Sequence, residues 1–560
     1  MTDAVTGSVR EAPAAAAAPA VAAFALFFAW ACRQAGYPAS QWAPGGLMLL
    51  ALIVISIGVR GVRMADVPLL VKISLVSLAA FTALSFLSIV WAPVPAEAFE
   101  GANRTLLYLL VFALFATWPL QTRSAALLLG GWTLAIVGLA AYVALRVDAA
   151  TSIGLHGLVP DGRLAFPSGY VNANAAQWLM AFWPAVLLAR SGRVPWGLRG
   201  LLAGGAVLLA EVALASQSRG SLLAMVAMLV LVFALLRDRT RTFALLLPVA
   251  VGIGAAAPAV LAVGDHLRNR MVSPTYVHEA TIATFTAAAA VGLLVALGAA
   301  IETRRLLSSS AFRRVRRAFS VLALATLLTI TVAAVVATGN PVTQIRHSWE
   351  SFKGGYPLTS GTGSRLVSGL GSNRYDFYRV ALDEFVAHPL FGIGADNFQQ
   401  EYLQHRHSVE SPRYPHSIEL RALTETGLVG TLLGVIGLSA GLLAGARAAR
   451  STSGLDPLAS AVAAAALGGF AYWLMHGSVD WFWEIAGLGA PAFALLGLAC
   501  SLARSAPEHL NAETSHRDRR RAGLRRAAFL QVPISRRVYV GAWVVLALAS
   551  AASLTAQWIR

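Results

Sequence analysis

Charged residues are scarce in this sequence, and their scarcity excludes an ordinary soluble domain. Of the 560 residues, 13% are charged and 57% are hydrophobic, and the mean hydropathy is +0.65. Soluble domains usually carry about 25% charged residues. Water is therefore not the main solvent of this chain, and the composition predicts a membrane protein.

Cysteine and lysine are nearly absent. The two cysteines, Cys32 and Cys500, lie in or beside apolar segments far apart in the sequence, which excludes a disulfide framework and a cysteine metal site. Only Lys72 and Lys353 are lysines, so arginine supplies almost all of the basic charge. The net charge of +17 alone would suit a nucleic-acid partner, but the positions of the arginines argue against one.

Long apolar runs make up most of the chain. They have the length of a helix that crosses a hydrocarbon core about 30 Å thick. We predict an all-α, polytopic membrane protein with about 12 to 15 transmembrane helices. The predicted spans are 18–36, 45–60, 67–91, 104–118, 124–145, 174–189, 200–215, 219–236, 242–263, 281–301, 318–338, 424–446, 457–475, 484–503 and 538–556.

The arginines fall in alternate links between these spans, which is the positive-inside pattern. This pattern predicts a bacterial inner-membrane protein whose N-terminus is cytoplasmic, with segments 92–103, 146–173, 264–280 and 339–423 in the periplasm. The arginines concerned are Arg60, Arg63, Arg190, Arg193, Arg237, Arg239, Arg241, Arg304, Arg305, Arg313, Arg314, Arg316, Arg317, Arg447 and Arg450.

The topology divides the chain into six parts. A basic linker near the C-terminus is either a solvated link or a contact to anionic headgroups. The parts are a cytoplasmic tail (1–17), eleven transmembrane helices (18–338), a periplasmic loop subdomain (339–423), three transmembrane helices (424–503), the basic cytoplasmic linker (504–537) and an additional C-terminal helix (538–556).

Segment 339–423 is the one long extramembrane stretch. Loops of this length are usually functional or disordered, and its many aromatic residues favour a folded, partly helical subdomain. Within it, Asn373 can cap a helix that Pro389 ends. A second helix is expected to begin at Pro415 and His416 and to lead into the next span.

Two arginine-bearing motifs fall at the predicted outer ends of helices. Arg219, in Ser216–Gly220, offers a planar fork of donors that suits a diphosphate, although an arginine that only snorkels to the interface is the alternative. Arg374 lies with Tyr378 and Arg379 ahead of the motif His388–Gly394. An ion pair to a neighbouring carboxylate is the alternative role for Arg374.

His416 is the third candidate. It lies near the start of a helix, where the positive end of the helix dipole disfavours the imidazolium, so it can stay neutral and accept a proton from a sugar hydroxyl. A structural or surface histidine is the alternative.

Two glutamates are candidates for supporting roles. Glu425 lies about nine residues after His416 and is interpreted as a supporting residue. Glu211, at lipid depth, is expected to partner an outer arginine.

Together these features resemble the O-antigen ligase family. The resemblance covers chiefly residues 165–435. Tyr378 stands where the family often has tryptophan, and the apolar segment after 536 exceeds the usual number of spans. The matching motifs, in chain order, are Ser218-Arg219-Gly220, Arg374 with Tyr378, His388 to Gly394, His416-Ser417, and Glu425 with Gly427 and Gly430.

The resemblance implies a type-C glycosyltransferase fold that needs no metal or other cofactor. The implied partners are the lipid bilayer, a donor glycan on undecaprenyl diphosphate, and lipid A-core or another glycan as acceptor. Arg219 and Arg374 would bind the diphosphate, and His416 would act as general base. Arg379, Tyr378, Asn172 and Asn174 are further expected substrate contacts, with helix capping as the alternative for the asparagines.

The residues support this chemistry independently of the resemblance. No Asp-x-Asp metal motif occurs in the sequence, so arginines must stabilise the charge that grows on a diphosphate leaving group. An oligosaccharide polymerase or a protein glycosyltransferase would share these motifs. A transporter or flippase is the alternative of another class, but the ionisable residues cluster at the helix ends and no internal repeat is evident.

Overall fold

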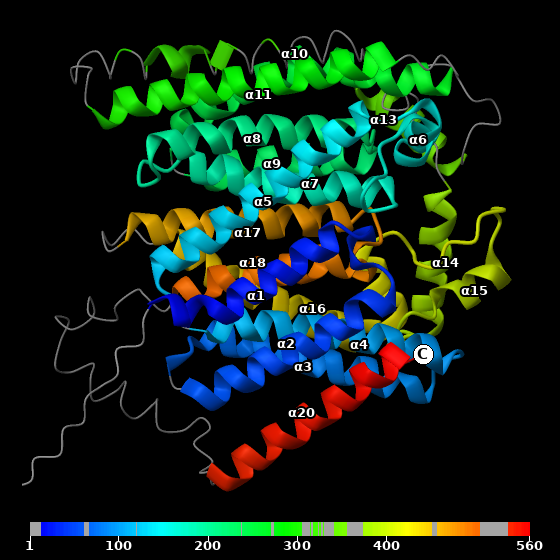
Figure 1. The fold of residues 1–560 in the computed structure, drawn as a ribbon. Coiled ribbons are helices and arrows are strands. Elements are labelled where there is room, and N and C mark those ends of the chain that lie inside the picture. Colours follow the sequence, from blue (N-terminus) through cyan, green and yellow to red (C-terminus); the bar gives the residue numbers. More distant parts are fainter. Residues whose placement is uncertain are drawn as a thin grey trace, which may run out of the picture.

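The computed structural model is a bundle of helices that run back and forth between two ends, at the left and right of Figure 1. The residues that it describes are 13–60, 66–118, 120–236, 238–269, 274–304, 341–354, 373–450, 456–503 and 536–559, with isolated positions between 314 and 329. Within these ranges every regular element is a helix. Most of the predicted span 318–338 and of the predicted linker 504–537 lies outside the described residues.

Nine of the described helices are long and apolar enough to cross a membrane, and four shorter ones are apolar. The all-α, polytopic class is therefore confirmed. The α-helices are α1 Pro13–Ala31, α2 Ala39–Arg60, α3 Leu69–Leu87, α4 Pro95–Thr117, α5 Thr122–Asp148, α6 Ser152–Leu158, α7 Val171–Ala189, α8 Trp196–Ala215, α9 Arg219–Leu235, α10 Arg239–Arg268, α11 Pro274–Thr303, α13 Pro341–Lys353, α14 Arg374–Ala387, α15 Phe398–His405, α16 Ile418–Arg450, α17 Pro457–Gly477, α18 Ala486–Leu502 and α20 Arg536–Ile559. Short 3-10 turns are η1 Gln34–Gly36, η3 Ser88–Val90, η4 Pro160–Gly162 and η5 Phe482–Glu484.

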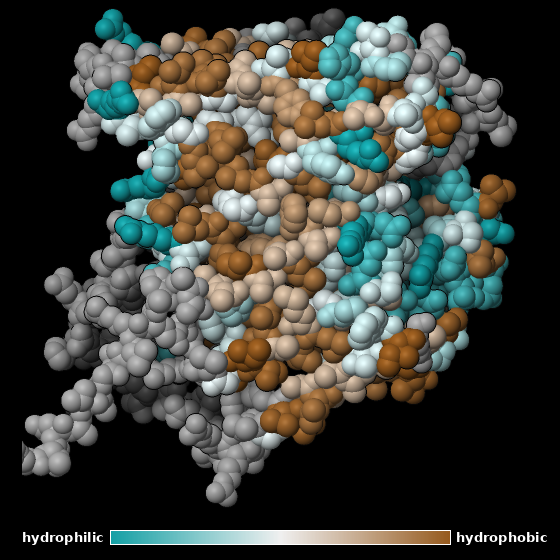
Figure 2. All heavy atoms as spheres, in the orientation of Figure 1, coloured by the Kyte–Doolittle hydropathy of each residue, from teal (hydrophilic) through white to brown (hydrophobic). Residues whose placement is uncertain are grey.

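The core lies around α7 and α18, and apolar side chains also cover the outside of the bundle. All of α18 and nearly all of α7 are buried. On the outer helices large apolar side chains are exposed, for example Leu293 at 67% and Val251 at 63%. Figure 2 shows this apolar band with hydrophilic residues at its ends. Exposed leucine and valine over such an area fit hydrocarbon as the solvent.

The two ends of the bundle differ in what they carry. One end holds α6, α14 and α15 and lies at the right of Figure 1; we call it the site face. The opposite end carries the links with Arg190, Arg193 and Arg241, and we call it the arginine face. Because successive helices alternate in direction, every arginine-rich link that is described falls on the arginine face. The cytoplasmic and periplasmic assignment of these faces stays a prediction.

The C-terminal helix α20 ends at the site face (Figure 1). It packs against α2 and α4, where the Ser553 hydroxyl donates a hydrogen bond of 2.7 Å to Oδ1 of Asn103. Leu554 is fully buried in the same interface, against Gly46. The extra apolar segment is therefore an integral helix of the bundle.

Gly427 breaks α16, and the break locks the 388–394 loop in place. Its backbone lies at φ 62° and ψ −164°, which frees the hydrogen-bonding groups of the surrounding turns. The loop uses them: the amides of Ile393 and Gly394 donate to the carbonyls of Thr424 and Glu425, both at 3.0 Å. In return the amides of residues 428 and 429 donate to the carbonyls of residues 389 and 390. The two predicted motifs thus form one interlocked unit.

We expect Gly427→Ala to reduce stability by about 3 kcal/mol. An added Cβ would lie 2.4 Å from the carbonyl of Leu390, and a positive φ is strained for alanine. Gly434→Ala is the matched control in the same helix, because no atom lies within 4 Å of its added Cβ. Thermal unfolding in detergent measures both variants, and equal melting temperatures would contradict the interlock.

Candidate functional site

Asp480 is the centre of a buried polar cluster at the site face. It lies in the link between α17 and η5 and is fully buried. Its carboxylate accepts hydrogen bonds from the Tyr170 hydroxyl at 2.9 Å, from Nδ2 of Asn172 at 2.6 Å and from the Arg374 guanidinium at 3.1 Å. Burial alone would raise the pKa of Asp480, but the positive charge of Arg374 holds it below its usual value. Asp480 is therefore a carboxylate that fixes Arg374.

His416 lies beside this cluster, where its tautomer is determined by the backbone. Its Nδ1 is 2.9 Å from the carbonyl oxygen of Tyr414, which can only accept a hydrogen bond, so Nδ1 carries the proton. Burial lowers the pKa of His416, and the positive charge of Arg374 acts in the same direction, while Asp480 opposes them. The imidazole is therefore neutral at pH 7, with Nε2 available as a proton acceptor.

The backbone and rings around His416 fix its orientation. The residue has φ 57°, a left-handed conformation, and α16 begins only at Ile418. The helix start predicted at Pro415 and His416 is thus two to three residues too early, because His416 belongs to the turn before the helix. The Tyr378 hydroxyl donates to the His416 carbonyl at 3.2 Å, and the ring of Phe377 lies 5.3 Å from the imidazole.

Of the predicted site residues, Arg374, Asn172, Tyr378 and His416 come together around Asp480. Arg374 is paired with Asp480 and not with the neighbouring carboxylates that were the alternative.

Arg219 is the first residue of α9, and this end of the helix lies at the same region. It is followed by Gly220, where an added Cβ would lie 2.9 Å from Nε2 of His476 and 3.4 Å from Val479. The first turn of α9 therefore packs directly against the segment that carries Asp480.

Arg379 and Asn174 lie in other surroundings. Arg379 binds Asp376 at 2.8 Å and Asp383 at 3.0 Å, within the subdomain of α14 and α15. Asn174 donates from Nδ2 to the Leu164 carbonyl and to the Ser216 hydroxyl inside the wall of the bundle. Both sets of contacts are structural. Asn174 lies inside α7, whose N-cap is Tyr170, so it does not cap this helix.

Glu211 does not have the arginine partner that was expected. Its side chain is buried, and neither carboxyl oxygen has a hydrogen-bond partner among the described residues. It lines an apolar cavity between α5, α8, α10 and α11. The prediction of a partner was wrong for the described part of the chain, because no described arginine lines this cavity.

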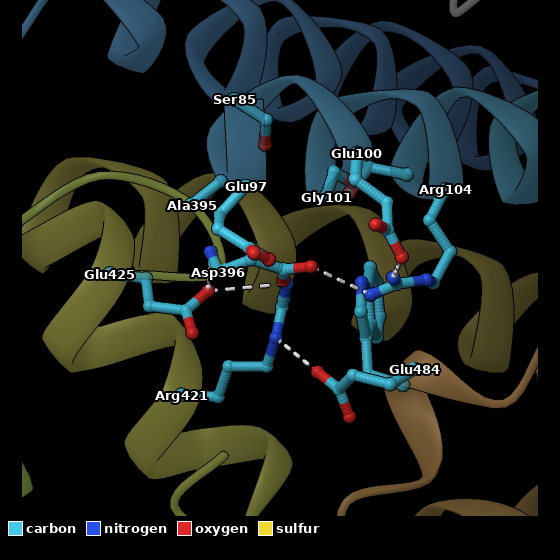
Figure 3. Close-up of polar contacts among 12 residues, drawn as sticks. Ser85, Glu97, Glu100, Gly101, Arg104, Ala395, Asp396, Arg421, Glu425 and Glu484 are labelled. Carbon is cyan, nitrogen blue, oxygen red and sulfur yellow. Dashed lines mark hydrogen bonds and ion pairs between the residues drawn. The ribbon is translucent and has the colours of Figure 1, made fainter. Parts of the chain in front are cut away.

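A second buried cluster of charged side chains joins α4, α16 and η5 (Figure 3). Asp396, which follows the 388–394 loop, binds Arg104 of α4 at 2.9 Å and Arg421 of α16 at 2.5 Å. Arg421 also lies 3.2 Å from Glu425 and 2.5 Å from Glu484. The cluster ties α4, α16 and η5 together, and so it determines where the turn before α16 lies.

Carboxyl groups outnumber guanidinium groups in this cluster. Arg104 and Arg421 face four carboxyl groups, those of Glu100, Asp396, Glu425 and Glu484, and burial raises the pKa of Glu484. Gly101 of α4 permits the close approach, because an added Cβ there would lie 2.7 Å from the Asp396 carboxyl. Glu425 thus has the supporting role that the sequence predicted, through Arg421 and the Asp396 amide.

We expect Asp396→Ala to destabilise the protein by about 3 to 5 kcal/mol, since Arg104 and Arg421 would stay buried without their shared carboxylate. Asp383→Ala removes an exposed ion pair with Arg379 and is expected to cost less than about 1 kcal/mol. Thermal unfolding of the two variants in detergent measures the difference. Similar losses in both would show that the cluster does not hold these helices.

Three residues of the cluster were not predicted from the sequence, namely Asp480, His476 and Tyr170. A signal for Asp480 was present: Val-Asp-Trp-Phe-Trp-Glu lies between two apolar spans, and its two carboxylates are the only ones from 457 to 503. His476 is buried in α17 and carried no such signal. Its Nδ1 lies 3.1 Å from the Tyr472 hydroxyl.

Fold and site define a polytopic helical membrane protein with a buried polar site at one end of its bundle. A sequence model of the O-antigen ligase family matches residues 280–435, from α11 to the first half of α16. The chain therefore carries an O-antigen ligase family domain, and the resemblance seen in its motifs is confirmed. This region includes Arg374 and His416, whereas Arg219 and Asp480 lie outside it. No curated protein matches the chain significantly.

Proposed function

We propose that this protein is an inverting, metal-independent glycosyltransferase that moves a glycan from undecaprenyl diphosphate to an acceptor hydroxyl at the periplasmic face. The most direct assignment is ligation of O-antigen to lipid A-core in lipopolysaccharide biosynthesis. The observation that carries the proposal is the convergence on Asp480 of His416 and Arg374, which both lie in the region that matches the O-antigen ligase family.

Arg374 and Arg219 are proposed to bind the donor diphosphate. Arg374 is held by Asp480 at 3.1 Å, and its side chain is 23% exposed. A buried carboxylate behind an arginine fixes the direction of its donors before the ligand binds. Such preorganised positive charge stabilises the negative charge that develops as the glycosidic bond breaks.

His416 is proposed to activate the acceptor. Nε2 accepts the hydroxyl proton while the acceptor oxygen attacks the anomeric carbon of the donor sugar. The bond from that carbon to the phosphate oxygen breaks, and its electron pair leaves with the diphosphate. The products are the glycosylated acceptor with inverted anomeric configuration, undecaprenyl diphosphate and a proton on His416 that passes to solvent.

A polymerase that uses the same donor but extends another lipid-linked glycan is the second candidate, because such an enzyme would share these motifs. The experiment is glycan transfer by purified protein in liposomes. The donor is given with lipid A-core in one reaction and with a lipid-linked glycan in another. Product on lipid A-core supports ligation, extension of the lipid-linked chain supports polymerisation, and no transfer in either reaction contradicts the proposal.

A further inference from the structure

Four aromatic side chains form a continuous strip from the surface to the candidate site. On α13 the Trp349 and Phe352 rings lie 5.9 Å apart, and each is 6.0 Å from the ring of Tyr375 on α14. Phe352 is also 6.1 Å from Tyr378. We call these residues the aromatic strip. Its outer end is open, since Trp349 is 51% exposed, and its inner end is bound to the His416 carbonyl.

The strip continues the candidate site outward. Tyr375 directly follows Arg374, which is proposed to bind the diphosphate, and Tyr378 lies one helical turn further. Trp349 and Phe352 are three residues apart, so they lie on the same face of α13. Tyr378 is four residues after Arg374 and so lies on the same face of α14. A ligand group attached to a diphosphate at Arg374 would therefore meet Tyr378 and then Phe352 and Trp349 as it leaves the site.

Charged groups around the strip favour a polar occupant with flat apolar faces. Lys353 lies 5.9 Å from the centre of the Trp349 ring and 2.9 Å from Glu350, and the side chain of Arg346 is exposed on the same helix. Sugar rings have this dual character, because their C–H faces stack on aromatic rings while their hydroxyls bind charged groups. A lipid chain would leave these charges in an apolar environment.

We infer that the aromatic strip is the binding subsite for the sugar rings nearest the diphosphate of the donor glycan. This inference rests on the proposed function and adds to it where the glycan part of the donor runs when its diphosphate is bound. The strip positions the glycan and takes no part in bond breaking. Its contribution therefore belongs to donor binding, and the reaction at His416 proceeds without it.

Hydroxyl-radical footprinting of the full chain in lipid nanodiscs tests the subsite directly. The probe is the oligosaccharide that mild acid releases from the undecaprenyl-diphosphate-linked glycan of the source cells. We expect it to reduce oxidation of Trp349 by about fivefold. Trp196 is the matched control, since it is 45% exposed but lies on the arginine face, and its oxidation should not change. Unchanged oxidation of Trp349 would overturn the inference.

Kinetics separate this subsite from the reaction. We expect Trp349→Ala to raise the donor KM about tenfold with kcat nearly unchanged, and Trp349→Phe to restore most of the affinity. An unchanged donor KM in Trp349→Ala would overturn the inference. It would do so even if Arg374→Ala abolished transfer and thereby supported the proposed function. Protection of Trp349 in nanodiscs relative to detergent, without glycan, would assign the strip to the membrane and overturn it too. A wild-type protein without transfer would contradict the proposed function, and the footprint would still decide on the subsite.

Discussion

Replacement of His416 by alanine is expected to slow glycan transfer by about 10²- to 10⁴-fold, the range typical of a lost general base. The reason is that Nδ1 is committed to the Tyr414 carbonyl and Nε2 is the nitrogen left to accept the acceptor proton. The measurement is the initial rate with purified variants in liposomes at saturating donor. A rate within a few fold of the wild type would remove His416 from the reaction.

The pH dependence tests the same residue without mutation. Burial lowers the pKa of His416 below its ordinary value of 6.5, and the neutral form is the active base. Transfer should therefore be independent of pH above 6.5 and should decline only at acidic pH, as His416 gains a proton. A rate that rises as the pH falls would require a protonated His416 and would contradict the assignment.

Arg374→Ala is expected to reduce transfer by about 10²- to 10³-fold, because the leaving diphosphate would lose a preorganised positive charge. It also leaves Asp480 buried without its cationic partner. Arg374→Lys should recover only part of the rate, since an ammonium lacks the planar fork of donors. Initial rates of the three proteins at saturating donor give both comparisons.

Arg379, one turn further along α14, provides the control for Arg374. It is bound to Asp376 and Asp383 and does not contact Asp480. We expect Arg379→Ala to stay within about tenfold of the wild-type rate. Equal losses for both arginines would instead favour the sequence prediction that Arg379 also binds substrate, and would contradict a special role for the pair with Asp480.

Patterns of local origin were predictable from the sequence. The length of the apolar runs predicted the helices, and Asn373 and Pro389 bracketed α14 correctly, although the Asn373 side chain makes no capping hydrogen bond. Arg374 and His416 were identified from the sequence motifs around them, which do not depend on burial. The family match covers both residues.

Contacts between distant segments could not be predicted. Asp480 meets Arg374 across more than a hundred residues, and Asp396 meets Arg104 across almost three hundred. Only the packing of α14 and α17 against α16, and the contact of Asp396 with α4, brings these charges together. For the same reason Arg379 and Arg374, which look equivalent on one helix, point to different partners.

The anomeric configuration of the product is the most direct test of the proposed reaction. In a single displacement His416 activates the acceptor, and no bond forms between glycan and protein. Nuclear magnetic resonance of donor and product from the reconstituted reaction should therefore show inversion at the transferred sugar. Retention of configuration would require a covalent glycosyl-protein intermediate and would contradict the role of His416 as the base on the acceptor.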